Sequence, residues 1–289
     1  MTEAELSFDE WFCRATDGTE LFFRSTRPAT QADAVMCLVH GHGDHCGSYG
    51  DAMRLLAARG FAVCGFDLRG HGRSGGPRGD SPSYQQLMDD VALLLSQTVE
   101  RFGGDMPRFL FGHSHGGGLV INYALRRQPA LNGVIATSPW LKLAFRPSPV
   151  MQLLAHVLRV VRPGLGVSPR DERRLPDMVG TGRPKPRDEM VHRVITPRLF
   201  FSTREANEWA LRNAARFPLP LLVIHGEADR ATSFDASRAF AETVPGDATF
   251  LPLAGMRHLI HVEGVEESLF DHVADWMHAH LNGYRSFAP

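Results

Sequence analysis

Short apolar runs alternate along the chain with longer segments in which apolar residues recur at helical spacing. Continuous apolar runs at 34–39, 61–66 and 219–224 predict strands that are buried on both faces. The helical spacing in 84–102 and in about 265–281 predicts helices that bury one face. Strands that alternate with helices in this way predict an α/β protein whose central sheet is mainly parallel and has right-handed crossovers.

Several other elements complete this pattern. Two alternating runs in residues 8–27 meet at Asp17-Gly18, which predicts a β-hairpin. Further strands are expected at 108–111, 134–136 and 248–253, and further helices at 49–59, 119–125 and 234–243. Because the strands are parallel, reactive side chains should gather at their carboxyl ends.

The alternation stops between residues 141 and 201. This segment contains eight prolines, and residues 142–198 carry 12 Lys and Arg against 5 Asp and Glu. Its one strongly amphipathic stretch is 150–161. A long insertion with little strand pattern, placed after a strand, is typical of an active-site lid. We therefore expect an α/β core at 1–140 and 202–289 and a cap at 141–201.

The clearest chemical signal is the stretch Arg108-Phe-Leu-Phe-Gly-His-Ser-His-Gly-Gly-Gly118, followed at once by an apolar helical segment. A buried strand that turns into a helix through glycines holds the central serine in a cramped turn, as in the nucleophile elbow G-x-S-x-G. A second match, Gly72-Arg-Ser-Gly-Gly76, has Pro77 and further glycines where the helix should begin. We therefore predict that Ser114 is a nucleophile and that Ser74 is a loop residue.

A serine hydroxyl needs a neighbouring base, and that base needs a third group to orient it. On a fold of this type the partners follow in the order Ser, acid, His, each just after a strand. Asp229 and His258 occupy such positions after the strands expected at 219–224 and 248–253. Other residues compete for these two roles, namely Glu227 and Asp67 for the acid and His261 and His225 for the base.

Acyl transfer also needs donors for the negatively charged oxygen of the tetrahedral intermediate. The expected pair is the backbone N–H after the nucleophile and one from the loop after the third strand. In this chain these are the backbone N–H groups of His115 and His42, so their side chains need not be catalytic.

The stretch His40-Gly-His42-Gly-Asp44-His45 supports a second hypothesis, because it fits the zinc motif H-x-H-x-D-H. A zinc site would leave the elbow, Asp229 and His258 without roles. A hydrolase with a catalytic serine explains the same stretch as the glycine-rich oxyanion loop. We therefore favour an enzyme with no metal and no cofactor.

Taken together, His40-Gly-His-Gly-Asp-His45, Asp67-Leu-Arg-Gly-His-Gly-Arg-Ser74, Gly112-His-Ser-His-Gly-Gly117, Gly226-Glu-Ala-Asp-Arg230 and His258-Leu-Ile-His261 resemble the monoacylglycerol lipase and lysophospholipase group of α/β-hydrolases. The resemblance covers nearly the whole chain outside 141–201. It implies an α/β-hydrolase fold, a triad of Ser114, Asp229 and His258, a cap, and hydrolysis of esters with one acyl chain. A proline iminopeptidase-like peptidase is the main alternative, since it shares the triad.

The same resemblance implies a polar substrate pocket lined by Asp44, His45 and His261. Two departures bear on the substrate. The residue after the nucleophile is commonly Met in such lipases and is His115 here, and this chain has Asp44 and Ser48 where those lipases carry a Glu and an Arg. Selectivity for glycerol therefore stays open.

Charge and cysteine content indicate which partners and which cellular location to expect for the protein. A net charge of −1 argues against general nucleic-acid binding, so the expected partner is a small acyl ester. The basic cap could also touch an anionic lipid surface. The four cysteines form no C-x-x-C pair, and neither a signal peptide nor an apolar run long enough to span a membrane is visible, so we expect a cytoplasmic protein.

Overall fold

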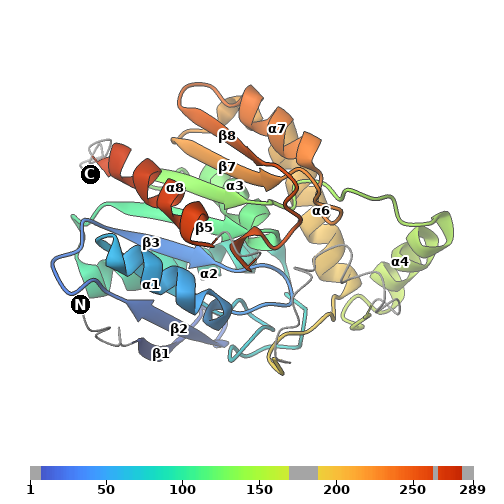
Figure 1. Cartoon of the computed structure of the whole chain (residues 1–289). Helices are drawn as coiled ribbons and strands as arrows, with labels where there is room; N and C mark the ends of the chain where they lie inside the picture. Colours follow the sequence, from blue (N-terminus) through green and yellow to red (C-terminus); the bar gives the residue numbers. More distant parts are fainter. Residues whose placement is uncertain (1–7, 169–187, 263–265, 282–289) are drawn as a thin grey trace.

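A computed structural model describes residues 8–168, 188–262 and 266–281 (Figure 1). Its centre is an eight-stranded sheet in the order β1-β2-β4-β3-β5-β6-β7-β8. β1 pairs antiparallel with β2, β2 pairs antiparallel with β4, and all other neighbours are parallel. The strands are β1 (Asp9–Arg14), β2 (Glu20–Thr26), β3 (Ala34–Val39), β4 (Phe61–Phe66), β5 (Arg108–His113), β6 (Gly133–Thr137), β7 (Leu221–Gly226) and β8 (Ala248–Leu253). The α/β-hydrolase architecture expected from the sequence is confirmed.

Helices cover both faces of the sheet (Figure 1). On one face pack α1 (Gly50–Ala58) and α8 (Glu266–Ala279), and on the other α2 (Tyr84–Phe102), α3 (His115–Arg127), α6 (Pro197–Arg212) and α7 (Phe234–Thr243). Within β3, Val35 and Cys37 belong to one hydrophobic core, and Met36 and Leu38 belong to the other. Burial on both faces is the reason that the parallel strands read as continuous apolar runs.

The predicted hairpin is β1 and β2, in which Asp9 pairs with Ser25 and Arg14 with Glu20. Gly18 has φ +85° in its turn, a conformation that is easy only for glycine. The hairpin forms the antiparallel edge of an otherwise parallel sheet.

Between β6 and β7 the chain leaves the sheet and forms α4 (Pro149–Val161) before returning through α6. Part of the expected cap, 169–187, lies outside the described residues. α6 continues across residue 201 and packs on α3, where Asn122 donates a hydrogen bond of 2.9 Å to Asn207. The cap boundaries at 141 and 201 therefore stay a prediction.

No helix in the described part of the chain combines the length and the apolar composition needed to cross a bilayer.

Candidate active site

Ser114 lies at the junction between β5 and α3 with φ +52° and ψ −113°. A positive φ at a non-glycine residue marks a strained turn, which is the geometry of a nucleophile elbow. The strain is held by close backbone packing. A Cβ at Gly112 would lie 2.4 Å from the carbonyl oxygen of Gly116, and a Cβ at Gly116 would lie 2.3 Å from that of Val39. Only glycine fits at these two positions.

Ser114, His258 and Asp229 meet at the carboxyl edge of the sheet, where they follow β5, β8 and β7. The Oγ of Ser114 lies 2.9 Å from Nε2 of His258. Nδ1 of His258 lies 2.7 Å from Oδ2 of Asp229. Both distances are within hydrogen-bond range, so two consecutive hydrogen bonds connect the Ser114 hydroxyl to the Asp229 carboxylate through His258.

The Asp229 carboxylate is surrounded by donors. Oδ1 accepts hydrogen bonds from the backbone N–H groups of Ala231 (2.7 Å) and Thr232 (3.0 Å). Oδ2 is contacted by the Thr232 hydroxyl (2.7 Å), His258 and His225. Burial by itself raises the pKa of Asp229, but the hydrogen bonds from His225 and His258 outweigh it and hold that pKa well below its usual range. Asp229 is therefore ionised at neutral pH.

The oxyanion loop predicted after β3 lies directly beside the nucleophile. A Cβ at Gly41 would lie 3.3 Å from Cβ of Ser114. His115 is the first residue of α3, so its backbone N–H has no acceptor within the helix. The structure thus places the two backbone amides expected to hold an oxyanion, those of His42 and His115, on the two segments that flank Ser114.

Four imidazole rings pack together around His42 of this loop. The ring of His42 lies edge-on to the rings of His71, His115 and His192, at centroid distances of 5.1, 6.1 and 5.7 Å. Burial, helped by the neighbouring histidines, lowers the pKa of His42 to about 3, and burial lowers the pKa of His115 to about 4. These two rings are therefore neutral at pH 7, and the sequence alone did not predict their contact.

The segment 188–196, which leads back from the expected cap, docks on the oxyanion loop. The backbone N–H of His192 donates to the carbonyl of Gly43 at 2.9 Å. Nε2 of His42 donates to the carbonyl of Val194 at 2.9 Å. The side chain of His42 therefore contacts the segment that returns from the expected cap, through a hydrogen bond that does not use its backbone N–H.

The three residues expected to line a polar pocket lie in different surroundings. Asp44 accepts hydrogen bonds from the Ser48 hydroxyl and from the backbone N–H of His45. His45 is buried, and its Nε2 lies 2.8 Å from Oδ2 of Asp188. His261 is buried and stacks on the ring of Tyr49 at 4.5 Å. Their role in binding substrate stays a prediction.

The histidines of the proposed zinc motif engage separate partners. His40 contacts the carbonyl of Gly41 through Nδ1 and accepts the backbone N–H of Leu68 through Nε2. His42 and His45 face Val194 and Asp188, as described above. Among the residues that the structure describes, no group of three or more His, Cys, Asp or Glu side chains is placed to hold a metal ion. The geometry does not support the zinc hypothesis.

Ser74, the serine of the second G-x-S-x-G match, and Asp67, an alternative acid, both make contacts that hold the backbone of a loop. Ser74 is buried in a loop, where its hydroxyl donates to the carbonyl of Asp67 at 2.5 Å and accepts the N–H of Phe22 at 2.9 Å. The Asp67 carboxylate accepts backbone N–H groups of Cys46 and Arg73. Ser74 and Asp67 thus brace the loop after β4.

Near the triad, Thr232 and His113 were assigned no role from the sequence, and His225 was considered only as a competing base. Thr232 and His225 both contact the Asp229 carboxylate. His113 packs its ring against that of His258 at 5.0 Å and contacts the Thr137 hydroxyl at 3.0 Å. The sequence indicated His225 as a candidate base near the end of a strand, but not its contact with Asp229.

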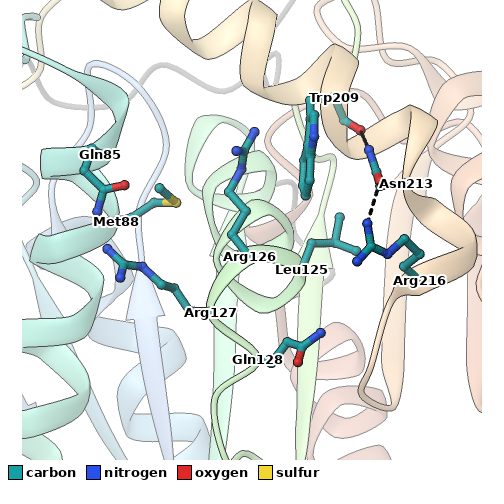
Figure 2. Close-up of a pocket in the computed structure, with 9 residues that line it drawn as sticks. All are labelled: Gln85, Met88, Leu125, Arg126, Arg127, Gln128, Trp209, Asn213 and Arg216. Carbon is teal, nitrogen blue, oxygen red and sulfur yellow. Dashed lines mark hydrogen bonds between the residues drawn. The ribbon is translucent and has the colours of Figure 1, made fainter.

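A separate groove of about 560 Å³ lies among α2, the C-terminal end of α3 and the C-terminal end of α6 (Figure 2). Each of its three guanidinium groups already has a neighbour. Arg126 lies over the ring of Trp209 at 3.7 Å, Arg127 pairs with Asp89 at 2.8 Å, and Arg216 contacts Asn213 at 3.5 Å. The groove contains none of the triad residues.

The fold and the Ser114–His258–Asp229 geometry define a serine hydrolase of the α/β-hydrolase class. Comparison with known proteins agrees with this. The sequence profile of the family described as serine aminopeptidase, S33 matches residues 30–264. The chain therefore belongs to this family, and it is a carboxylic ester hydrolase.

Three individual similarities stand out. A monoacylglycerol lipase from Mycolicibacterium smegmatis is 29% identical over 91% of this chain and 95% of its own length. An uncharacterized abhydrolase domain-containing protein from Dictyostelium discoideum is 31% identical over 95% of this chain, which spans 29% of that protein's length. The crystal structure of Paleococcus ferrophilus monoacylglycerol lipase matches with a TM-score of 0.73 and 32% identity, covering 96% of this chain and 99% of that one.

Proposed function

We propose that this enzyme hydrolyses monoacylglycerols, lysophospholipids or similar esters with one acyl chain, and that Ser114, His258 and Asp229 carry the reaction. The observation that carries the proposal is the continuous hydrogen-bonded relay from the Ser114 hydroxyl through His258 to Asp229. The substrate class rests on the similarity to monoacylglycerol lipases over nearly the whole chain.

The reaction proceeds through an acyl-enzyme. Ser114 Oγ attacks the ester carbonyl carbon while its proton passes to Nε2 of His258, and the backbone N–H groups of His42 and His115 hold the resulting oxyanion. When the intermediate collapses, the C–O bond to the alcohol breaks and the alcohol leaves with the proton from His258. Water then attacks the acyl-enzyme, gives a proton to His258, and the acid leaves as Ser114 regains its hydrogen. Ionised Asp229 stabilises the imidazolium in both halves.

Labelling with a fluorophosphonate tests the nucleophile directly. The wild-type enzyme should be labelled and lose turnover of a short p-nitrophenyl ester, and Ser114→Ala should show neither labelling nor turnover. Ser74→Ala is the matched control, because Ser74 sits in the second G-x-S-x-G motif. Retained turnover in Ser114→Ala would overturn the proposal, and so would loss of turnover in a folded Ser74→Ala.

A peptidase of the proline iminopeptidase type is the second candidate, because the matching family is described as serine aminopeptidase, S33. Parallel assays with monoacylglycerols, lysophospholipids and aminoacyl amides separate the two. Higher kcat/KM on the esters supports our proposal, and higher kcat/KM on the amides favours the peptidase.

The part of the cap that the structure describes supports contact with a lipid surface. α4 turns polar side chains towards α6, where Arg159 pairs with Glu205 at 2.7 Å and His156 lies against Phe201 at 4.7 Å. α4 stands out from the body of the sheet (Figure 1), and most of its apolar side chains are exposed. Exposed on this helix are Val150, Met151, Leu153, Leu154, Val157, Val160 and Val161. An apolar patch of this kind marks a docking surface, and the basic character of 142–198 suits an anionic membrane.

Flotation with vesicles tests this membrane contact. The wild-type enzyme should bind vesicles that contain anionic phospholipid, with an affinity that falls as salt rises. Val150→Asp combined with Leu154→Asp should abolish binding, whereas Val99→Asp, at an exposed apolar position on α2, should not. Failure of the wild type to bind at any salt concentration would refute the contact.

We also propose a cytoplasmic location. All four cysteines are free thiols, and Cys37, Cys46 and Cys64 are buried. Unpaired cysteines are typical of a reducing compartment. Fractionation of the native host, with an activity-based probe to follow the enzyme, tests the location.

A further inference from the structure

The acid of the triad is shared between two histidines. Nε2 of His225 lies 3.0 Å from Oδ2 of Asp229, the same oxygen that Nδ1 of His258 contacts at 2.7 Å. The side chain of His225 is completely buried at the end of β7. Within the part of the chain that the structure describes, its Nδ1 is buried and has no hydrogen-bond partner. The mechanism above gives this residue no task.

The hydrogen on the His225 ring can be placed from its surroundings. A ring nitrogen that faces a carboxylate oxygen must carry a hydrogen, since a lone pair there would be repelled. Nδ1 has no acceptor to which it could donate. The neutral ring protonated at Nε2 therefore satisfies the contact with Asp229 and leaves no buried donor unpaired.

This inference rests on the triad proposed above. We propose that His225 is a positioning residue of that triad. It holds Oδ2 of Asp229 in line with His258 and takes up part of the charge of the Asp229 carboxylate. The backbone N–H groups of Ala231 and Thr232 hold the other oxygen, Oδ1. Besides His258, Oδ2 is contacted by the Thr232 hydroxyl at 2.7 Å and by His225 at 3.0 Å, so His225 adds a second buried anchor for this oxygen. His225 cannot act as the base, because its Nε2 is hydrogen-bonded to Asp229 and its side chain is completely buried.

Two effects should follow when this anchor is lost. The carboxylate becomes freer to turn, so the Ser114–His258 pair is less well aligned and kcat falls. In addition, His225 no longer shares the negative charge of Oδ2. The Asp229 carboxylate then favours the protonated form of His258 more strongly, so the acidic limb of the pH–rate profile moves to higher pH. Substrate binding should be unaffected, because the His225 side chain is completely buried and contacts Asp229.

Among the residues that the structure describes, the titratable groups that pack against this cluster are His113 and, against the ring of His113 at 4.5 Å, His261. The ring of His113 lies 5.0 Å from that of His258. Burial, with the nearby His261 and His258, holds the pKa of His113 well below its usual range, so it stays neutral while activity is measured. An apolar side chain, Phe234, also packs on His225, with its ring edge-on at 5.7 Å. A shift of the acidic limb therefore reports on His225, Asp229 and His258.

The test compares His225→Leu, which removes the donor, with His225→Gln, whose amide N–H can reach the position of Nε2. With a p-nitrophenyl ester, His225→Leu should lower kcat about tenfold, leave KM within twofold, and raise the midpoint of the acidic limb by about 0.5 pH unit. His225→Gln should recover kcat to within about threefold and restore the midpoint. The matched control is His280→Leu, since His280 also faces an aspartate, with Nε2 2.8 Å from Asp247 far from the triad. It should change neither quantity.

The proposal is overturned if His225→Leu keeps the wild-type kcat and midpoint, or if the Leu and Gln variants lose activity equally with the midpoint unmoved. If neither variant folds, ¹⁵N NMR of the wild-type histidines decides, because the proposal requires His225 to be protonated at Nε2 and not at Nδ1. Ser114→Ala, assayed in parallel, separates this inference from the proposed function. Turnover by Ser114→Ala contradicts the triad itself, whereas an inactive Ser114→Ala with an unaltered His225→Leu contradicts only the role of His225.

Discussion

Gly41 and Ser114 lie so close that a Cβ added to Gly41 would sit 3.3 Å from the Cβ of Ser114. The two residues are 73 positions apart in the sequence, at the carboxyl ends of adjacent parallel strands β3 and β5. This contact brings the loop that carries His42 against Ser114, and the proposed oxyanion site depends on it.

Replacing Gly41 by alanine should therefore impair catalysis more than folding. The added methyl group would meet His113 and Ser114 at 3.2 and 3.3 Å, so the loop must shift by a few tenths of an ångström. We expect kcat to fall about tenfold, because small displacements of oxyanion donors weaken transition-state binding. Steady-state kinetics with a short ester measures the effect. An unchanged kcat would show that this loop does not hold the oxyanion.

Neutralising Asp229 should nearly abolish turnover. Asp229→Asn removes the charge that stabilises the imidazolium of His258 and presents a donor where Nδ1 must donate, so we expect kcat to fall about 10⁴-fold. Glu227→Gln is the control, because Glu227 is exposed and lies only two residues away. It should stay near the wild type. Loss of activity in Glu227→Gln with an active Asp229→Asn would assign the acid to Glu227.

Gly116→Ala should destabilise the protein strongly. An added Cβ would sit 2.3 and 2.5 Å from the carbonyl oxygens of Val39 and His40, so α3 would have to move away from β3. We expect a loss of about 3 kcal/mol in the free energy of unfolding, measured by urea denaturation. Gly104→Ala, where nothing lies within 4 Å, should change it by less than about 0.5 kcal/mol. Equal losses in the two variants would contradict the close packing at the elbow.

The histidine after the nucleophile should make stability depend on pH. Burial lowers the pKa of His115 to about 4 from a usual value of 6.5. Below pH 6.5 the unfolded chain binds a proton there that the native state does not, so stability falls with pH down to about 4, by about 1.4 kcal/mol per pH unit.

His115→Met removes this linkage while filling the site with an apolar side chain. The drop in unfolding free energy between pH 7 and pH 5 should therefore be about 2 kcal/mol smaller in the variant than in the wild type. Urea denaturation at the two pH values measures it. The exposed His272→Gln should leave the drop unchanged, and an equally steep drop in His115→Met would show that His115 titrates normally.

Much of the core architecture could be predicted from local patterns. Runs such as 34–39 and 61–66 indicated strands buried on both faces, because Val35 and Met36 alternate between two cores. Gly112, Ser114 and Gly116 indicated the elbow, since the spacing of glycines determines where two backbones can approach. The order of Ser114, Asp229 and His258 along the chain led us to expect the contacts that the structure has.

Other features depend on contacts that no local pattern contains. Helical spacing over 150–161 indicated an apolar face, but not that α4 turns this face to solvent and its polar side towards α6. Likewise, the sequence offered His225 as a competing base, and only the structure places its ring on Asp229.

The sequence by itself determined the strands and the elbow, because these depend on neighbours a few positions apart, and it also gave the order of the proposed triad along the chain. The tertiary structure alone decided which carboxylate oxygen two histidines share and which way α4 faces. Those outcomes depend on how separate elements rotate and pack against one another, and segments distant in sequence set that rotation.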